Sequence, residues 1–151
     1  MVVMTAKLDK KKIGLVLAGL ALVIVLLIAL FGGGKNSADP VETNADRVAL
    51  LNAYGWQVEE TPVKTQKVII PTDTSDVFAK YNELQKNQGF DLTAYAGKEA
   101  TRYVYTVTNF PDAKGTVYAT LLVYNGQVIG GDVTLNDTGD SGVIQGLKKT
   151  D

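Results

Sequence analysis

The sequence predicts an α+β domain that follows a single membrane-spanning helix. One long apolar run lies near the N-terminus, two helix patterns each stop at a glycine followed by an aromatic residue, and later segments alternate in β-branched and aromatic residues. These three observations predict an N-terminal transmembrane helix, followed by a small domain in which two helices pack on a mostly antiparallel sheet.

The apolar run covers residues 13–31 and contains no charged or polar side chain in IGLVLAGLALVIVLLIALF. A helix of that length rises about 28 Å, close to the roughly 30 Å thickness of bilayer hydrocarbon. Because the run is apolar on every side, a domain of this size has too little surface to bury it. We therefore expect residues 13–31 to be a signal-anchor helix whose partner is the lipid bilayer.

The charges on either side of this run predict its orientation. Residues 1–12 form a basic tail with four lysines and one aspartate. Since positively charged flanks remain in the cytoplasm, we expect a cytoplasmic N-terminus and an extracytoplasmic C-terminal domain at the cell membrane. A cleaved signal peptide is the alternative, although the apolar core of such a peptide normally has only about 7–15 residues.

Small residues within the run raise the question of dimerisation. Gly14, Ala18 and Ala21 lie at positions i, i+4 and i+7, a spacing through which two spanning helices can approach closely. Glycine and alanine are also frequent in spanning helices that do not associate. The pattern therefore permits a dimer without favouring one.

A short polar segment separates the run from the predicted domain. Residues 32–43 read GGGKNSADPVET, a composition typical of a flexible linker. A flexible chain of this length spans on the order of 20 Å, which would hold the domain of residues 44–151 close to the bilayer.

The first helix of the domain has a signal at each end. Thr43 and Asp46 have the spacing of a capping box, and Gly55 provides the left-handed residue that ends a helix. Trp56 follows at the position where a hydrophobic residue folds back on the last turn. A ligand-stacking role for Trp56 is the alternative to this core or cap position.

The second helix is predicted after the capping residues of segment 72–76. Its end repeats the earlier device, because Gly89 is followed by the aromatic Phe90. The predicted apolar side of this helix consists of residues at helical spacing, namely Val77, Phe78, Tyr81 and Leu84.

The remaining segments predict the sheet. Val68–Ile70 is β-branched and ends at Pro71, and residues 102–110 alternate between two faces. The Asn125-Gly126 pair predicts a two-residue hairpin that pairs Tyr124 with Gln127 and Leu122 with Ile129. Because both faces carry apolar residues, we expect the helices over one face and partial cover on the other.

Composition excludes several classes of activity. The chain has no cysteine, no histidine and a net charge of −1. Thiolate nucleophiles, cysteine-ligated zinc, histidine-dependent hydrolysis and disulfides are therefore excluded, and no cofactor or metal motif is present. The near-neutral charge also argues against nucleic acid as a partner, because nucleic-acid binding needs clustered lysine and arginine.

Asp132 is the most site-like position in the sequence. It follows Gly130-Gly131 inside a predicted strand, where glycines indicate a bulge or a close backbone approach. Arg102, on a neighbouring predicted strand, is a candidate partner. The alternative is a structural bulge with a surface ion pair and no functional role.

Aromatic residues complete the set of candidate binding residues. Tyr103 and Tyr105 lie on one face of a strand, where they could stack on a sugar or a peptide, although ordinary sheet packing explains them too. The loop Asn136–Ser141 is rich in oxygen ligands but lacks the spacing of a calcium-binding EF-hand, so we expect a solvated turn. The candidate binding residues are Asp132, Arg102, Tyr103, Tyr105 and Trp56.

Several short segments occur in a characteristic order along the domain: NADR at 44–47, YGWQV at 54–58, YNELQ at 81–85 with GFDL at 89–92, RYVY at 102–105 with NFP at 109–111, LVYNG at 122–126, IGGD at 129–132 and GL at 146–147. From residue 44 to about residue 147 the chain therefore resembles a bacterial family of domains of unknown function, numbered 4830. The resemblance implies short, membrane-anchored exported proteins of Gram-positive bacteria. No catalytic residues are established for the family, so none are transferred to this chain.

These observations favour a binding, interaction or scaffold module at the cell envelope, with an envelope protein or glycan as its partner. The alternatives are a glycan-directed envelope enzyme that uses a carboxylate site around Asp132, and a sensory domain that acts through a membrane partner. An enzyme of the first kind needs two carboxyl groups about 5–9.5 Å apart across a cleft. A tail of only twelve residues leaves little room for a signalling output of its own.

The predicted orientation can be tested by protease treatment of intact cells. We expect the protease to remove residues 44–151 and to leave the N-terminal tail protected, because only the domain is exposed outside the membrane. Immunoblotting with tags at the two ends of the chain measures both outcomes. A domain that resists the protease in intact cells, but not in lysed cells, would overturn the orientation.

Overall fold

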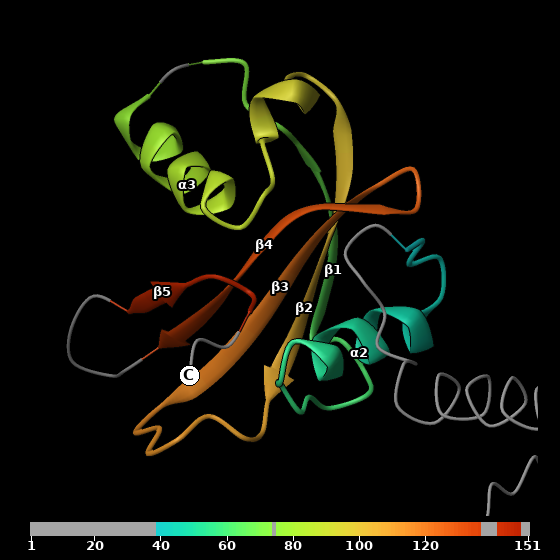
Figure 1. Ribbon diagram of the computed structural model, residues 1–151, viewed down its shortest axis with the longest axis vertical. Coiled ribbons are helices and arrows are strands. Elements are labelled where there is room, and N and C mark those ends of the chain that lie inside the picture. The colour runs from blue at the N-terminus through green and yellow to red at the C-terminus, as the bar shows by residue number, and fades with distance from the viewer. Residues whose placement is uncertain (1–38, 74, 137–141, 149–151) are drawn as a thin grey trace, which may run out of the picture. The chain divides into compact units, whose positions relative to one another are not determined.

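A five-stranded antiparallel sheet forms the centre of the domain in the computed structural model, which describes residues 39–73, 75–136 and 142–148 (Figure 1). Neighbours in the sheet are also neighbours along the chain, so the strands form a simple meander. The strands are β1 (Lys64–Ile69), β2 (Glu99–Val107), β3 (Thr116–Tyr124), β4 (Gln127–Asn136) and β5 (Val143–Gln145). The predicted α+β class, with two helices and an antiparallel sheet, is confirmed for this part of the chain.

Several sequence predictions lie outside the described residues. They are the basic tail 1–12, the apolar run 13–31 with its stripe of Gly14, Ala18 and Ala21, the linker up to residue 38, and residues 137–141 of the oxygen-rich loop. Within residues 39–73, 75–136 and 142–148, no helix has the length and apolar character needed to cross a membrane.

The first described helix, α2 (Asn44–Ala53), begins and ends as predicted. The Thr43 hydroxyl accepts a hydrogen bond from the Asp46 amide at 3.1 Å, and the Thr43 amide donates to the Asp46 carboxylate at 3.0 Å. Gly55 has a φ of 96°, and the Trp56 amide folds back to the Leu51 carbonyl at 3.0 Å. The capping box and the glycine stop are therefore both confirmed.

Part of the predicted linker belongs to the folded domain. Val41 is only 1% exposed and packs in the same core as α2. Its amide donates to the Gly126 carbonyl, in the turn between β3 and β4, at 2.8 Å. The packed domain therefore includes Val41, three residues before the predicted boundary at residue 44.

The second helix, α3 (Asp76–Lys86), ends with the same device as α2 but faces the sheet differently from the prediction. Phe90 folds back to the Gln85 carbonyl at 2.9 Å, as the sequence predicts. Val77, however, is 81% exposed, and the two buried residues of α3 are the amides Asn82 and Gln85. The predicted apolar side is therefore wrong at Val77, because α3 turns Gln85 toward the backbone of β4 and Asn82 toward Asp91 and Leu92.

The two helices lie on opposite faces of the sheet, not together on one face as predicted. Leu50 and Leu51 of α2 pack with odd-numbered residues of β2 and β3, whereas α3 and the short helix η1 (Leu92–Tyr95) pack with even-numbered ones. Because successive strand residues point to opposite faces, these two clusters lie on the two sides of the sheet. Both faces are therefore covered, each by its own helical segment.

The hairpin between β3 and β4 forms at the predicted turn but shifts register sooner than expected. Asn125 and Gly126 have φ values of 48° and 73°, and Tyr124 pairs with Gln127. Leu122 then pairs with Gly130 instead of Ile129, because the register shifts at this point. The bulge lies at Ile129, next to the Gly130-Gly131 pair where a bulge or a close approach was predicted, and it displaces the predicted Leu122–Ile129 pair by one residue.

Gly130 and Gly131 allow other parts of the chain to approach the bulged region of β4 closely. A Cβ atom on Gly131 would collide with the Thr120 carbonyl and lie 2.8 Å from Leu147 Cδ1. A Cβ atom on Gly130 would lie 3.0 Å from Gln85 Oε1 and 3.1 Å from a Leu92 methyl group. The first obstacle includes rigid backbone, whereas the second consists of side-chain atoms alone.

We predict that Gly131→Ala destabilises the domain by about 2–3 kcal/mol, the upper range for overpacking a core. Gly130→Ala is the matched comparison and should cost less, because its Cβ would meet side-chain atoms at 3.0 Å or more and no backbone atom. Denaturant unfolding of the purified chain, followed by the fluorescence of Trp56, measures both values, since Trp56 is the single tryptophan. If both substitutions lowered the free energy of unfolding by the same amount, the predicted role of the Thr120 carbonyl would be contradicted.

Candidate functional site

Helix α3 is held on the sheet by amide side chains that bind the backbone of β4. Gln85 Oε1 accepts from the Gly131 amide at 2.8 Å, and Gln88 Nε2 donates to the Gly131 carbonyl at 3.2 Å. Gln88 Oε1 also accepts from the Leu147 amide at 2.6 Å. These two glutamines therefore connect α3 with β4 and with the segment that follows β5.

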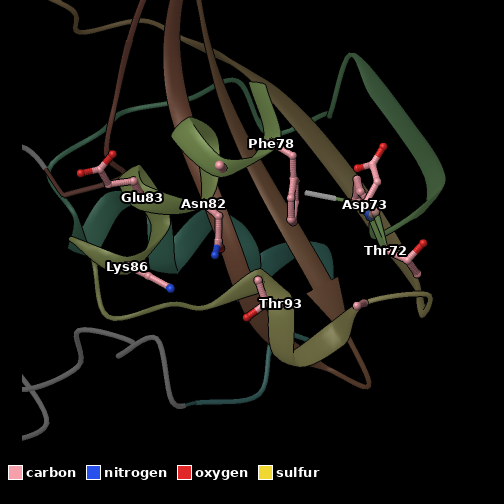
Figure 2. A pocket seen from close by; sticks show the side chains of 10 residues that line it. Thr72, Asp73, Phe78, Asn82, Glu83, Lys86 and Thr93 are labelled. Atoms are coloured by element: carbon pink, nitrogen blue, oxygen red, sulfur yellow. The ribbon is translucent and has the colours of Figure 1, made fainter. Parts of the chain in front are cut away.

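This placement of α3 creates a cavity of about 440 Å³ between the helix, η1 and the segment that follows β1. We call it the α3 groove. Figure 2 shows Phe78 and Asn82 extending from α3 toward η1, which carries Thr93. The groove is lined by Pro71, Thr72, Asp73, Phe78, Ala79, Asn82, Glu83, Lys86, Thr93 and Ala96.

The wall of the α3 groove is fixed by hydrogen bonds around Asn82. Its amide donates to the Asp91 carboxylate at 3.1 Å, and its oxygen accepts from the Leu92 amide at 2.8 Å. Asp91 also accepts from the Thr93 hydroxyl at 2.6 Å and from the Thr93 amide at 3.0 Å. The Thr93 hydroxyl, followed by Asn82, lowers the pKa of Asp91 to about 2.

The charged groups of the groove lie near its ends. Asp73 comes from the segment after β1, whereas Glu83 and Lys86 come from the second half of α3 (Figure 2). Lys86 lies 4.0 Å from the Asp91 carboxylate, and both side chains are largely exposed. An exposed pair at this distance contributes little to stability, so the ammonium group of Lys86 remains available to a ligand.

Asp132 lies beside α3 on the same face of the sheet, and it is buried instead of exposed. It is 6% exposed, accepts from the Tyr81 hydroxyl at 2.8 Å and accepts from the Thr134 hydroxyl at 2.7 Å. Burial raises the pKa of the Asp132 carboxyl, while Thr134, Tyr81 and the charge of Arg102 oppose the rise. Asp132 therefore fastens α3 to β4 through Tyr81.

The expected surface ion pair between Arg102 and Asp132 is replaced by the bonds from Tyr81 and Thr134. Within the described part of the chain, the two residues form no direct ion pair, although Arg102 is near enough to influence the pKa of Asp132. Arg102 is half-buried and pairs with Leu122 across β2 and β3. The sequence thus correctly placed Arg102 near Asp132, but the residues that bond to Asp132 are Tyr81 and Thr134.

The aromatic candidates lie on the opposite face, under α2. Tyr105 is fully buried, and its hydroxyl accepts from Arg47 at 2.9 Å and donates to Asn44 at 2.8 Å. The Arg47 guanidinium lies 3.7 Å from the centre of the Tyr103 ring. These contacts are a cation–π and hydrogen-bond anchor for α2.

Trp56 belongs to the same core. It is 1% exposed, its indole nitrogen donates to the Leu147 carbonyl, and its ring stacks on Phe110 at 5.8 Å between centroids. The five candidate binding residues therefore separate into two groups, with Trp56, Tyr103 and Tyr105 on the α2 face and Arg102 and Asp132 on the α3 face. They do not form one site.

Sequence reasoning missed the polar residues in and just after α3 that hold this helix in place. Asn82, Gln85 and Gln88 have helical spacing next to Phe78 and Tyr81, and this mixed polar and aromatic stripe was the available signal. Among residues 39–73, 75–136 and 142–148, no group of three or more acidic residues is arranged to hold a metal ion.

The raised pKa of Asp132 predicts a pH-dependent stability. Protonation is favoured in the folded state, so Asp132 adds stability at pH values below its unfolded pKa, and this contribution is lost as the pH rises through its folded pKa. The melting temperature of the wild type, relative to that of Asp132→Asn, should therefore be higher at pH 4 than at pH 8.

Thermal melts of both proteins across this range measure the difference. Asp112→Asn, which changes an exposed carboxyl in the β2–β3 loop, is the control for loss of one charge. A difference between wild type and Asp132→Asn that does not vary with pH would show that the folded domain does not favour the protonated Asp132.

Comparison with known families gave one match, whereas comparison with curated proteins and with solved structures gave none. The family model described as "Domain of unknown function (DUF4830)" matches residues 50–133. This range covers β1, α3, η1, β2 and β3, includes every residue that lines the α3 groove, and reaches past Asp132. The match extends over more than half of the chain, which therefore belongs to the DUF4830 family.

Proposed function

We propose that this protein is a membrane-anchored extracytoplasmic module that binds a component of the cell envelope in the α3 groove. The cavity is the observation that carries the proposal. Ligand sites usually have volumes of about 300–1,000 Å³, apolar walls and a few fixed polar groups. The α3 groove has a volume of about 440 Å³ and apolar side chains from Phe78, Ala79 and Pro71.

The polar groups of the groove support the same function. Asn82 is held rigidly by Asp91 and Leu92, whereas Lys86 and Asp73 offer opposite charges at exposed positions. A ligand with an apolar middle and polar or charged ends matches this lining. An extended peptide segment of an envelope protein has this character, and so does a substituted glycan.

The proposed location of the protein in the cell is supported by its sequence. The uncharged residues 13–31 and the basic tail 1–12 support an anchor with the domain outside the cytoplasm. A ligand of the domain would then belong to the envelope, within reach of a short linker.

The carboxylate enzyme is a weaker candidate for this site. Asp132 is the buried carboxylate on the α3 face, and its two oxygens each accept a hydrogen bond from a neighbouring side chain. A general acid must reach its substrate, whereas these contacts hold Asp132 against α3. The geometry therefore supports a structural use of this carboxylate within a binding module.

The proposal is tested by photocrosslinking in intact cells that produce the full chain. A diazirine-bearing side chain replaces Ala79, which lines the groove, or Lys80, an exposed neighbour on α3 that does not. We expect light-dependent adducts with an envelope component from position 79 and several-fold fewer from position 80, because only the first site faces the groove.

A second variant separates occupation of the groove from chance proximity. With the crosslinker kept at position 79, Asn82→Leu removes the fixed amide and should reduce the adducts. Glu83→Gln, which changes an exposed group of the same groove, serves as the comparison. Equal labelling from positions 79 and 80 would refute binding in the groove.

A further inference from the structure

We propose that the β3–β4 hairpin end of the domain rests on the surface of the lipid bilayer, with Tyr95, Lys98 and Tyr124 as its contact residues. This inference rests on the proposed membrane anchor and goes beyond it, because it assigns an interaction surface and its partner. The surface, called the hairpin end below, comprises Tyr95, Lys98, Tyr124 and the Asn125-Gly126 turn.

The first argument is the place where the chain enters the domain. Val41 is fixed beside the hairpin, because its amide donates to the Gly126 carbonyl at 2.8 Å. Figure 1 shows residues 39–43 next to the turn between β3 and β4, with the β2–β3 loop at the other end of these strands. The described chain therefore enters the domain at the hairpin end.

The second argument is the length of chain between the predicted anchor and Val41. Ten residue steps separate Phe31 from Val41, and they reach at most about 35 Å when fully extended. A flexible chain of that length has a typical span of about 17 Å. At that typical span the hairpin end stays close to the bilayer, whereas nine-residue strands such as β3, which extend about 30 Å, can carry the β2–β3 loop much farther away. The β2–β3 loop is near the bilayer only in some orientations of the domain.

The third argument is the chemistry of the hairpin end. The rings of Tyr95 and Tyr124 meet edge to face with centroids 5.5 Å apart, and Lys98 Nζ lies 5.2 Å from the Tyr124 ring centre. Both tyrosines are half-buried and Lys98 is exposed. Tyrosine and lysine are typical of membrane interfaces, because an apolar body enters the boundary while a polar tip stays in water.

An exposed apolar side chain lies at the same end of the sheet. Ile69, the last residue of β1, is 60% exposed and pairs with Glu99 beside Lys98. An interfacial position would remove part of this side chain from water, at about 25 cal/mol for each Å² of apolar surface buried.

Docking at the hairpin end would also determine where the α3 groove lies relative to the bilayer. Helix η1 supplies Tyr95 to the contact surface and Thr93 to the groove. The groove would therefore open beside the bilayer, where it could receive a segment of a membrane protein or a lipid-linked glycan.

The inference is tested on the full chain reconstituted into phosphatidylcholine–phosphatidylglycerol vesicles that contain headgroup spin-labelled lipid. The chain has no cysteine, so Ala94→Cys and Ala113→Cys each give one labelling position for a fluorophore. Ala94 is an exposed residue beside Tyr95, and Ala113 is an exposed residue of the β2–β3 loop. We expect the lipid to quench the fluorophore at position 94 several-fold more strongly than at position 113.

Substitutions then test the contact residues themselves. Tyr124→Ser and Lys98→Ser should each reduce quenching at position 94, because they remove the aromatic and cationic contacts. Tyr118→Ser is the matched control, because Tyr118 is a half-buried tyrosine of the same strand that lies toward the β2–β3 loop. Fluorescence of Trp56 verifies that each variant is folded.

Flotation of the vesicles distinguishes the two possible failures. A chain that does not float with the vesicles overturns the membrane anchor and, with it, this inference. A chain that floats but shows equal quenching at positions 94 and 113 overturns the docking alone and leaves the anchor supported. Quenching that is stronger at position 113 would reverse the proposed orientation and also refute the docking.

Discussion

The contact between α3 and the bulged segment of β4 is the interaction on which the α3 side of the domain depends. Gln85 accepts a hydrogen bond from the Gly131 amide, and Gln88 donates one to the Gly131 carbonyl. No side chain larger than hydrogen fits at position 131. A buried backbone group left unpaired costs about 1–3 kcal/mol, so these glutamines are structural requirements. The same contact positions the helical wall of the groove and brings Tyr81 over Asp132.

The two faces of the sheet are stabilised in different ways. Under α2 the core is mainly apolar. Arg47, the buried charged residue on this face among the described residues, is bound by the Tyr105 hydroxyl and the Tyr103 ring. Under α3 the buried groups include amides, and one of them, Gln85 Nε2, has no partner among the described residues. Close packing fixes the distances between apolar side chains, and hydrogen bonds also fix the direction of the groups that they join. The buried amides of α3 therefore fix the direction in which this helix presents the wall of the groove.

The sequence predicted the features that depend on a few consecutive residues. The Thr43 capping box, the glycine stops at Gly55 and Gly89 and the Asn125-Gly126 turn all follow from local backbone preferences. It did not predict the side of α3 that faces the sheet, because Asn82 and Gln85 are buried only where Leu92, Asp91 and Gly131 supply partners. The α3 groove itself was missed for the same reason. Its walls come from three segments that are separate in the sequence.

Asp132 shows how a tertiary contact changes the role that is inferred for a residue. Seen in sequence, a carboxylate after two glycines suggested either a site or a surface ion pair with Arg102. In the fold, Gly130 leaves room for Gln85 of α3, and Tyr81 of the same helix reaches that carboxylate, so this glycine and the acid serve one contact. A carboxylate that must hold a helix in place is constrained in position and in hydrogen bonding. The groups free to meet a ligand are instead those of the adjacent groove, where Lys86 and Asp73 are exposed and Asn82 is rigid.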